Sequence, residues 1–135
     1  MTSNKFIIVT GGAGFIGSNL VKYLNKLGYT SIMIIDSLNY GGSENNLAKL
    51  EYVKLSDYKN GLDYLKNTIS DLKVEAVFHI GANADVLQSN IDDMINNNFD
   101  HSRFWFNFSK EQNCPFIYAS SSAVYGNSTD FYVQQ

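Results

Sequence analysis

Cysteine, histidine and proline are scarce in this chain of 135 residues, which has one cysteine, two histidines and one proline. Cys114 has no partner for an intramolecular disulfide. The spacing of the cysteine and the histidines does not resemble a zinc site. We therefore expect a fold held by its hydrophobic core, without metal, in the reducing cytoplasm.

Clusters of positive charge and long apolar runs are also missing. Ten Lys and Arg residues are dispersed among thirteen Asp and Glu, for a net charge of -3, so we do not expect a nucleic acid partner. The apolar run at residues 6–9 is interrupted by glycines before it reaches the length of a signal peptide or a membrane span. With 44% hydrophobic and 17% charged residues, the composition is typical of one compact domain over residues 1–135.

Short apolar runs alternate with longer segments of helical period, which is the pattern of a sheet with helices on both faces. The centres of these runs, such as residues 32–35, are continuously apolar, which favours parallel strands buried on both faces. Right-handed crossovers then predict the order 3-2-1-4-5. The predicted fold class is α/β, a Rossmann-type doubly wound parallel sheet. The expected strands are residues 5–10, 31–36, 52–55, 74–80 and 115–120.

Three helices are predicted from apolar residues at helical spacing. Gly28 follows the first of them, where a left-handed C-cap would end it. The aromatic stripe of the third is expected to pack in the core. The residues expected on the three helices are Ile16, Leu20, Leu24 and Leu27, then Leu62, Leu65, Ile69 and Leu72, then Met94, Ile95, Asn98, Phe99, Ser102, Trp105 and Phe106.

The turn between the first strand and the first helix has the sequence TGGAGFIG. Gly11 allows a tight turn, Gly14 lets the backbone approach a pyrophosphate, and Gly17 lets the helix pack closely on the sheet. The helix begins at Phe15 and Ile16, where free N–H groups and the positive end of the dipole favour phosphate. Because strand, turn and helix follow in this order, the pattern predicts a dinucleotide site. An ordinary turn is the alternative.

An acidic residue, Asp36, ends the second strand 19 residues after Gly17. This is close to the spacing of a carboxylate that accepts the ribose hydroxyls of a dinucleotide. The next residues, Ser37 to Tyr40, include no cation that could meet a 2′-phosphate. We therefore predict NAD, with Ser37 also at the site, and NADP as the alternative. A carboxylate that only caps the next turn is the other interpretation of Asp36.

Two further strand ends carry candidate residues for the same cofactor. Asp57 and Tyr58 end the third strand, where a carboxylate and a flat ring could hold an adenine, although a surface turn explains Asp57 almost as well. Gly81 and Ala82 follow the fourth strand and are small enough for a ribose to lie against them. His79 is a weak catalytic candidate, because a histidine at a strand end is more often structural.

Hydroxyl groups gather after the fifth strand, in the segment SSSAVYG at residues 120–126. Ligands of open α/β sheets bind at this edge. The chain has no G-x-S-x-G sequence and no evident His/Asp pair for an acyl nucleophile. Hydrogen bonding to a substrate hydroxyl is therefore the role expected of these serines.

Together these motifs resemble the extended short-chain dehydrogenase/reductase superfamily, also described as NAD-dependent epimerases and dehydratases. Its members carry TGGxGFIG at the start and SSxxVYG at the fifth strand. Within it, the chain is similar to the ADP-glyceromanno-heptose 6-epimerases from about residue 5 to residue 131. The segments that carry this second likeness are VEAVFH (74–79), GA (81–82), NNF (97–99), PFIYASS (115–121) and STDF (128–131).

The resemblance assigns roles to single residues. Ser121 matches the catalytic serine of the family, and Asn98 matches an asparagine near the cofactor. Tyr125 is not the catalytic tyrosine, which belongs to a later Tyr-x-x-x-Lys motif that this sequence lacks. The chain reaches Gln135 before that helix would begin, so we expect an incomplete domain without the substrate-binding part. The family commonly has Thr-Thr-Glu where this chain has VLQ at residues 86–88.

The activity implied is epimerisation of a nucleotide sugar by transient oxidation with a bound nicotinamide cofactor. The substrate implied is similar to ADP-heptose, in lipopolysaccharide biosynthesis, and a homo-oligomer remains open. Two alternatives also stay open. One is a non-catalytic dinucleotide-binding module. The other is an epimerase or dehydratase of a UDP-, GDP- or dTDP-sugar.

Overall fold

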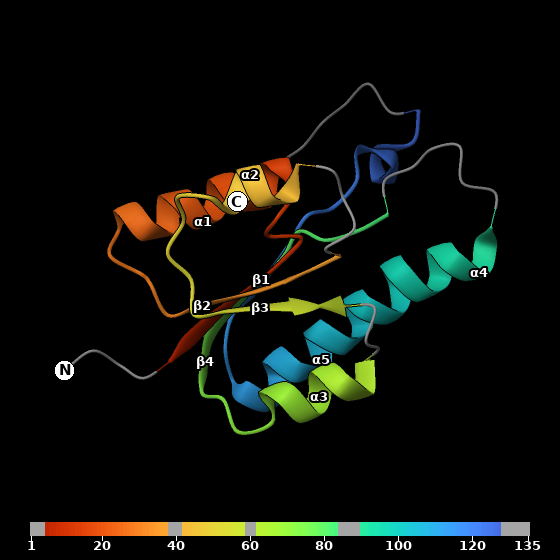
Figure 1. The fold of residues 1–135 in the computed structure, drawn as a ribbon. Helices are drawn as coiled ribbons and strands as arrows, with labels where there is room; N and C mark the ends of the chain where they lie inside the picture. Colours follow the sequence, from red (N-terminus) through yellow and green to blue (C-terminus); the bar gives the residue numbers. More distant parts are fainter. Residues whose placement is uncertain (1–4, 38–41, 59–61, 84–89, 128–135) are drawn as a thin grey trace.

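The computed structural model describes residues 5–37, 42–58, 62–83 and 90–127. Its centre is a five-stranded parallel sheet in the order β3-β2-β1-β4-β5 (Figure 1). This confirms the predicted fold class and strand order. The strands are β1 (Phe6–Thr10), β2 (Ile32–Asp36), β3 (Lys54–Asp57), β4 (Val74–His79) and β5 (Phe116–Tyr118).

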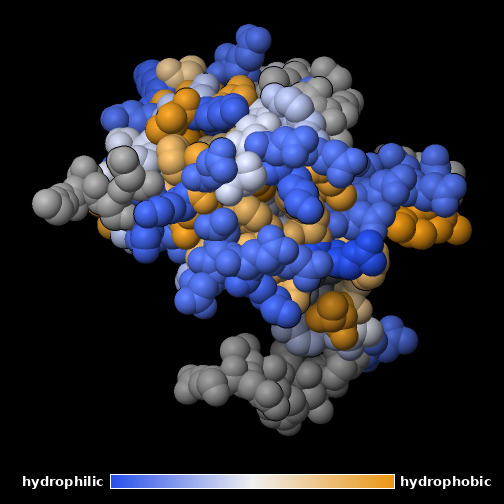
Figure 2. Space-filling view, turned by 90° about the horizontal axis from the view of Figure 1, so that it is seen from below, coloured by the Kyte–Doolittle hydropathy of each residue, from blue (hydrophilic) through white to orange (hydrophobic). Residues whose placement is uncertain are grey.

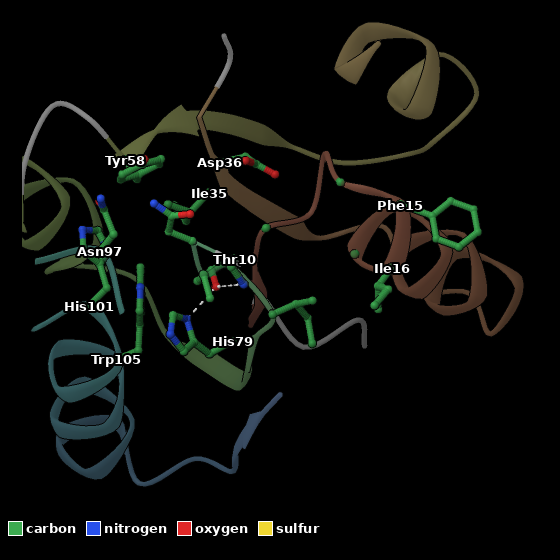
Figure 3. A pocket seen from close by; sticks show the side chains of 17 residues that line it. Thr10, Phe15, Ile16, Ile35, Asp36, Tyr58, His79, Asn97, His101 and Trp105 are labelled. Atoms are coloured by element: carbon green, nitrogen blue, oxygen red, sulfur yellow. Dashed lines mark hydrogen bonds between the residues drawn. The ribbon is translucent and has the colours of Figure 1, made fainter. Parts of the chain in front are cut away.

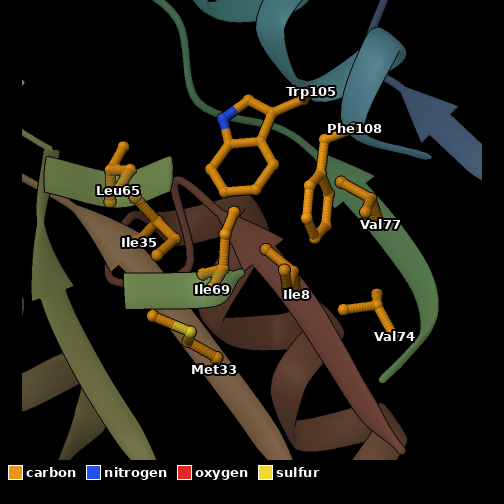
Figure 4. Close-up of a cluster of buried hydrophobic side chains, with 9 residues drawn as sticks. All are labelled: Ile8, Met33, Ile35, Leu65, Ile69, Val74, Val77, Trp105 and Phe108. Carbon is orange, nitrogen blue, oxygen red and sulfur yellow. The ribbon is translucent and has the colours of Figure 1, made fainter. Parts of the chain in front are cut away.

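Helices cover both faces of the sheet and bury a core on each. Figure 1 shows α1 and α2 on one face, and α3 and α5 on the other. Under α1 and α2 the core includes Val9, Val21 and Ile34. Under α3 and α5, Trp105 and Phe108 pack over the sheet (Figure 4). The helices are α1 (Phe15–Lys26), α2 (Ser43–Leu47), α3 (Leu62–Ile69), α4 (Ile91–Met94), the π-helical η2 (Ile95–Asp100), α5 (His101–Gln112) and the short 3₁₀ helix η3 (Ser122–Tyr125).

The strand register aligns the ends of four strands along one edge of the sheet. Thr10 at the end of β1 pairs with Ile35 of β2 on one side and with His79 of β4 on the other. Asp36 of β2 pairs in turn with Asp57 of β3. Because parallel strands all end at the same edge, the residues after β1, β2, β3 and β4 form one surface.

The third strand lies two residues later than expected, at Lys54–Asp57 instead of residues 52–55. The predicted bounds were chosen from the apolar residues of this segment. Tyr52 does pack against the core, although it precedes the strand. The bounds of the strand are set by its hydrogen-bonded pairing with β2, which continues as far as the pair of Asp36 with Asp57. The fifth strand is shorter than expected for a related reason: it pairs with only three residues of β4, Val77 to His79.

The buried face of α1 matches the predicted one only in part. Leu24 is buried and Leu20 packs against the core, as expected, whereas Ile16 and Leu27 are 67% and 57% exposed. The other buried residues are Gly17, Ser18 and Val21. The close approach of Gly17 to the glycine turn fixes which face of the helix meets the sheet. The predicted cap is confirmed, because Gly28 has φ +91° and its N–H donates to Asn25.

One long helical segment, α4 followed by η2 and α5, carries the aromatic stripe. Trp105 and Phe108 are buried, whereas Phe99 and Phe106 are 60% and 49% exposed. Packing of the stripe in the core is therefore confirmed for Trp105 and wrong for Phe99 and Phe106, because only one side of α5 faces the sheet. The second predicted helix is confirmed as α3, with Leu65 and Ile69 buried.

The face of the molecule seen from below in Figure 2 is mostly hydrophilic, with apolar side chains between the hydrophilic ones. Within the described ranges, no helix has both the length and the apolar character needed to cross a bilayer. The same ranges contain no cluster of His, Cys, Asp and Glu that could hold a metal ion.

Candidate functional site

A cavity of about 410 Å³ lies at the carboxyl ends of β1, β2 and β4. The glycine turn and the start of α1 form one side of it, with Phe15 and Ile16 at the rim (Figure 3). The opposite side comes from Tyr58 after β3 and from α5 and η2. The cavity therefore lies where open α/β sheets bind ligands.

Two glycines of the turn are required by backbone contacts. Gly11 has φ +67°, and a Cβ there would lie 2.6 Å from the backbone nitrogen of Gly81. A Cβ on Gly17 would lie 2.0 Å from the carbonyl oxygen of Gly11. The turn is thus packed directly against both its own helix and the segment after β4.

Gly14 differs, because the protein leaves room for a side chain there. A Cβ at Gly14 would meet only the Gly11 carbonyl, at an ordinary 3.4 Å. Gly14 lines the cavity and is the N-cap of α1, which has no side-chain cap and no acidic residue in its first turn. An open backbone at an uncapped helix N-terminus fits a pyrophosphate, which such a terminus attracts through its N–H groups and dipole.

Asp36 is held against the glycine turn. Its carboxylate accepts hydrogen bonds from the backbone N–H groups of Ala13, at 2.8 Å, and Ser37, at 2.6 Å. The residue is only 7% exposed. Burial raises the pKa of the Asp36 carboxyl above its usual value, while these backbone N–H groups oppose the rise. The carboxylate lines the cavity with its position fixed.

His79, which lines the cavity, connects β4 to β1 and α5. Its Nδ1 lies 2.6 Å from the Thr10 hydroxyl, and its Nε2 lies 2.9 Å from the Ser102 hydroxyl of α5. Thr10 in turn accepts a hydrogen bond from the Gly81 N–H at 3.1 Å. Burial lowers the pKa of His79 to about 4, so the ring is neutral at pH 7. Both ring nitrogens are thus within hydrogen-bond distance of hydroxyl groups, which ties β4 to β1 and α5.

Asparagines hold the segment after β4. The Asn98 amide donates to the Asn83 carbonyl at 3.0 Å and accepts from the Asn83 N–H at 2.7 Å. Asp93 accepts hydrogen bonds from the side chains of Asn83 and Asn97. This network holds Asn83, two residues after Gly81, against the long helix.

Tyr58 and His101 meet on the inner wall of the cavity. Their ring centroids are 5.3 Å apart and their planes are nearly perpendicular, at 88°. Burial lowers the pKa of His101 below its ordinary value, partly offset by Asp100. Trp105 lines the cavity one helical turn further along α5.

Most of the predicted cofactor residues line this one cavity. They are Gly11, Gly14, Phe15, Ile16, Gly17, Asp36, Tyr58, Gly81 and Ala82. Ser37, Asp57 and Asn98 lie beside the cavity lining without being part of it: Ser37 donates to Asp36, Asp57 pairs with Asp36 in the sheet, and Asn98 binds Asn83. Asn97, its neighbour, lines the cavity instead.

Ser121 lies apart from these residues. It is exposed, and its hydroxyl accepts a hydrogen bond from the Ala123 N–H at 3.1 Å, which caps η3. It is not among the residues that line the cavity. Three segments named from the sequence lie outside the described residues: 38–40, 86–88 and 128–131.

Sequence reasoning missed the wall contributed by the long helix. Asn97, His101 and Trp105 are spaced four residues apart, so they share one side of that helix. Polar and aromatic residues at this spacing, after a segment rich in asparagine, were a usable signal. Their position over the sheet edge, however, depends on how α5 packs.

Comparison with known proteins gives consistent results. The NAD dependent epimerase/dehydratase family matches residues 7–135. An ADP-L-glycero-D-manno-heptose-6-epimerase of Brachyspira hyodysenteriae is 40% identical over 124 residues, which are 90% of this chain and 38% of that protein. Among solved structures, the ADP-L-glycero-D-manno-heptose-6-epimerase of Helicobacter pylori has a TM-score of 0.80 at 27% identity, covering 96% of this chain and 43% of that one.

A UDP-glucose 4-epimerase of Thermotoga maritima, solved with UDP-glucose, is also similar. Its TM-score is 0.79 at 28% identity, over 94% of this chain and 41% of that one. The chain thus spans about two fifths of the length of these relatives.

Proposed function

This chain belongs to the NAD dependent epimerase/dehydratase family, and we propose that residues 1–135 form a dinucleotide-binding domain of a nucleotide-sugar epimerase. The observation that carries the proposal is the open backbone at Gly14. Its neighbours Gly11 and Gly17 are glycines because the fold requires them, but the space at Gly14 serves only the cavity. A phosphate group bound at the N-terminus of α1 explains that space.

The cofactor we propose is NAD rather than NADP. Asp36 is nearly buried and lines the cavity, so its carboxylate would meet a 2′-phosphate as a like charge. The residues that follow it in the sequence, as far as Tyr40, include no cation. A free 2′-hydroxyl, by contrast, can donate a hydrogen bond to the carboxylate.

Each part of the chain has a distinct task in the proposed reaction. The glycine turn and the start of α1 bind the pyrophosphate, and Asp36 holds the adenosine ribose. When bound, NAD supplies reversible hydride transfer, which allows a carbinol carbon to be oxidised and reduced again from the other face. Ser121 donates a hydrogen bond to the substrate oxygen. A serine hydroxyl alone is a poor proton acceptor at neutral pH, and the 135 residues contain no Tyr-x-x-x-Lys motif to take that proton.

The substrate we propose is an ADP-heptose or a sugar like it. The identity of 40% to a heptose epimerase supports this choice. The similarity to an epimerase solved with UDP-glucose keeps another nucleotide sugar as the alternative. We place the reaction in the cytoplasm, because the single cysteine suits a reducing compartment.

A second candidate function is a dinucleotide-binding module without catalysis. It is favoured by the position of Ser121, which is exposed and outside the cavity lining. The gene sequence after the codon of Gln135 separates the two. A downstream Tyr-x-x-x-Lys segment in the same frame supports the epimerase, and a stop codon there supports the module.

Mass spectrometry of small molecules released from the purified protein tests the shared part of the proposal. We expect NAD, because the cavity suits a pyrophosphate and a ribose with a free 2′-hydroxyl. Protein that has lost its ligand during purification should take NAD up again on incubation. Release of a flavin or coenzyme A, or failure to take up NAD, would contradict the proposal.

A further inference from the structure

The side of the cavity opposite the glycine turn is formed by residues from two elements that are distant in the sequence. Tyr58 follows β3, and His101 begins α5. Both line the cavity, and their rings meet edge to face with centroids 5.3 Å apart. Figure 3 shows the two side chains on the same side of the cavity, opposite Phe15 and Ile16.

The contact restricts the Tyr58 ring. Tyr58 also packs against the hydrophobic core that contains Trp105 and Leu65. The ring is therefore supported by the core and by His101 while its remaining surface lines the cavity. Burial lowers the pKa of His101, which favours the neutral imidazole in this contact.

The helix that carries His101 is itself anchored at this point. The π-helical segment η2 ends at Asp100, directly before His101. The Asn98 amide within η2 makes two hydrogen bonds to the backbone of Asn83 after β4. Single turns of π-helix are frequent at functional sites. Here the segment fixes His101 relative to the strand ends.

We propose that His101 is a positioning residue, which holds the Tyr58 ring as the surface on which the adenine base of NAD packs. The inference rests on the proposed binding of NAD. A flat base stacks on an aromatic ring only if that ring keeps its orientation, and an edge-to-face partner supplies this restraint. His101 is outside the motifs of the glycine turn and of the serine segment.

Four variants test the proposal: His101→Leu, His101→Phe, Tyr58→Leu and the double variant His101→Leu/Tyr58→Leu. Affinities for NAD and for AMP are measured by calorimetry, with thermal unfolding as a check of folding. We expect His101→Leu to weaken both ligands by the same factor, roughly threefold to tenfold, the range of one aromatic pair. His101→Phe should restore most of the affinity, because it keeps an aromatic ring in contact with Tyr58. In the Tyr58→Leu background, His101→Leu should have little further effect.

Phe99→Leu is the matched control, since it removes an exposed aromatic ring from the same long helix outside the cavity. It should leave both affinities unchanged. The proposal is overturned if His101→Leu binds AMP as tightly as the wild type, if His101→Phe is as weak as His101→Leu, or if the effects of the two single variants add fully. A wild-type chain that binds neither NAD nor AMP would instead refute the proposed function.

Discussion

The glycine turn and the serine segment after β5 lie at the same edge of the sheet, but they are built differently. In the glycine turn, Gly11 and Gly17 are in backbone contact with their neighbours, and Asp36 is 7% exposed. After β5, the helix η3 has no buried residue, and Tyr118 before it is 58% exposed. The difference teaches that the cofactor side is preorganised by packing, while the serine side has little within the described residues to hold it.

The largest expected effect of this difference is on catalysis. We expect that residues 1–135 alone bind NAD but do not epimerise a nucleotide sugar, because removing a positioned general base costs about 10² to 10⁴ in rate. Loss of substrate orientation adds to this cost. The measurement is an NMR assay of ADP-heptose incubated with the chain and NAD. If the chain epimerised the sugar and the Ser121→Ala variant did not, residues 1–135 would contain all the groups that catalysis requires, and the expectation would be wrong.

A pair of substitutions tests the same contrast in stability. Gly17→Ala places a Cβ 2.0 Å from the Gly11 carbonyl oxygen, which should cost about 3 kcal/mol or fail to fold. Ser121→Ala removes only the cap of an exposed 3₁₀ helix and should cost less than about 1 kcal/mol. Urea unfolding of both variants gives the two values. Equal losses would mean that the two regions are packed alike.

Acid should weaken the cofactor side through His79. Its pKa in the folded protein is about 4, below the value of 6.5 for a free histidine, so the unfolded chain binds the extra proton first. Stability is therefore full above pH 6.5 and falls as the pH drops toward 4, by about 3 kcal/mol. Urea unfolding at several pH values measures this slope. His79→Gln, which cannot be protonated, should flatten it, and an unchanged slope would assign the loss to other groups.

A smaller effect is expected in the choice of cofactor. NAD should bind at least about tenfold more tightly than NADP, because like charges at the Asp36 carboxylate and the 2′-phosphate repel. Titration of both dinucleotides by calorimetry measures the ratio. Equal or tighter binding of NADP would show that a cation from elsewhere in the chain reaches the ribose.

The parts of the fold that were predictable from the sequence are those with a local signal. The strand order and the turn at Gly11 follow from apolar runs and glycine spacing, which need no tertiary contact to be recognised. The exposure of Ile16 and the bounds of β3 could not be predicted in this way. The first depends on how closely Gly17 approaches the turn, and the second on the length of β2.

In the candidate site, too, the residues that belong to a local motif were predictable and those placed by tertiary packing were not. Gly14 and Asp36 belong to a motif, and the structure brings them to one cavity. Asn97 and His101 reach that cavity only because α5 packs on the sheet and η2 is anchored to Asn83. Nothing near them in the sequence specifies those contacts, and the family resemblance pointed to their neighbour Asn98.

We expect the space at Gly14 to hold the pyrophosphate of NAD, and the variant Gly14→Val would fill that space. The φ of -75° and ψ of 177° at Gly14 suit any residue, and a Cβ there has only an ordinary contact with Gly11. Thermal unfolding should therefore change little, while calorimetric titration should show NAD affinity reduced by at least about tenfold, since the added methyl groups occupy the phosphate position. A stable Gly14→Val protein that binds NAD as tightly as the wild type would contradict the account.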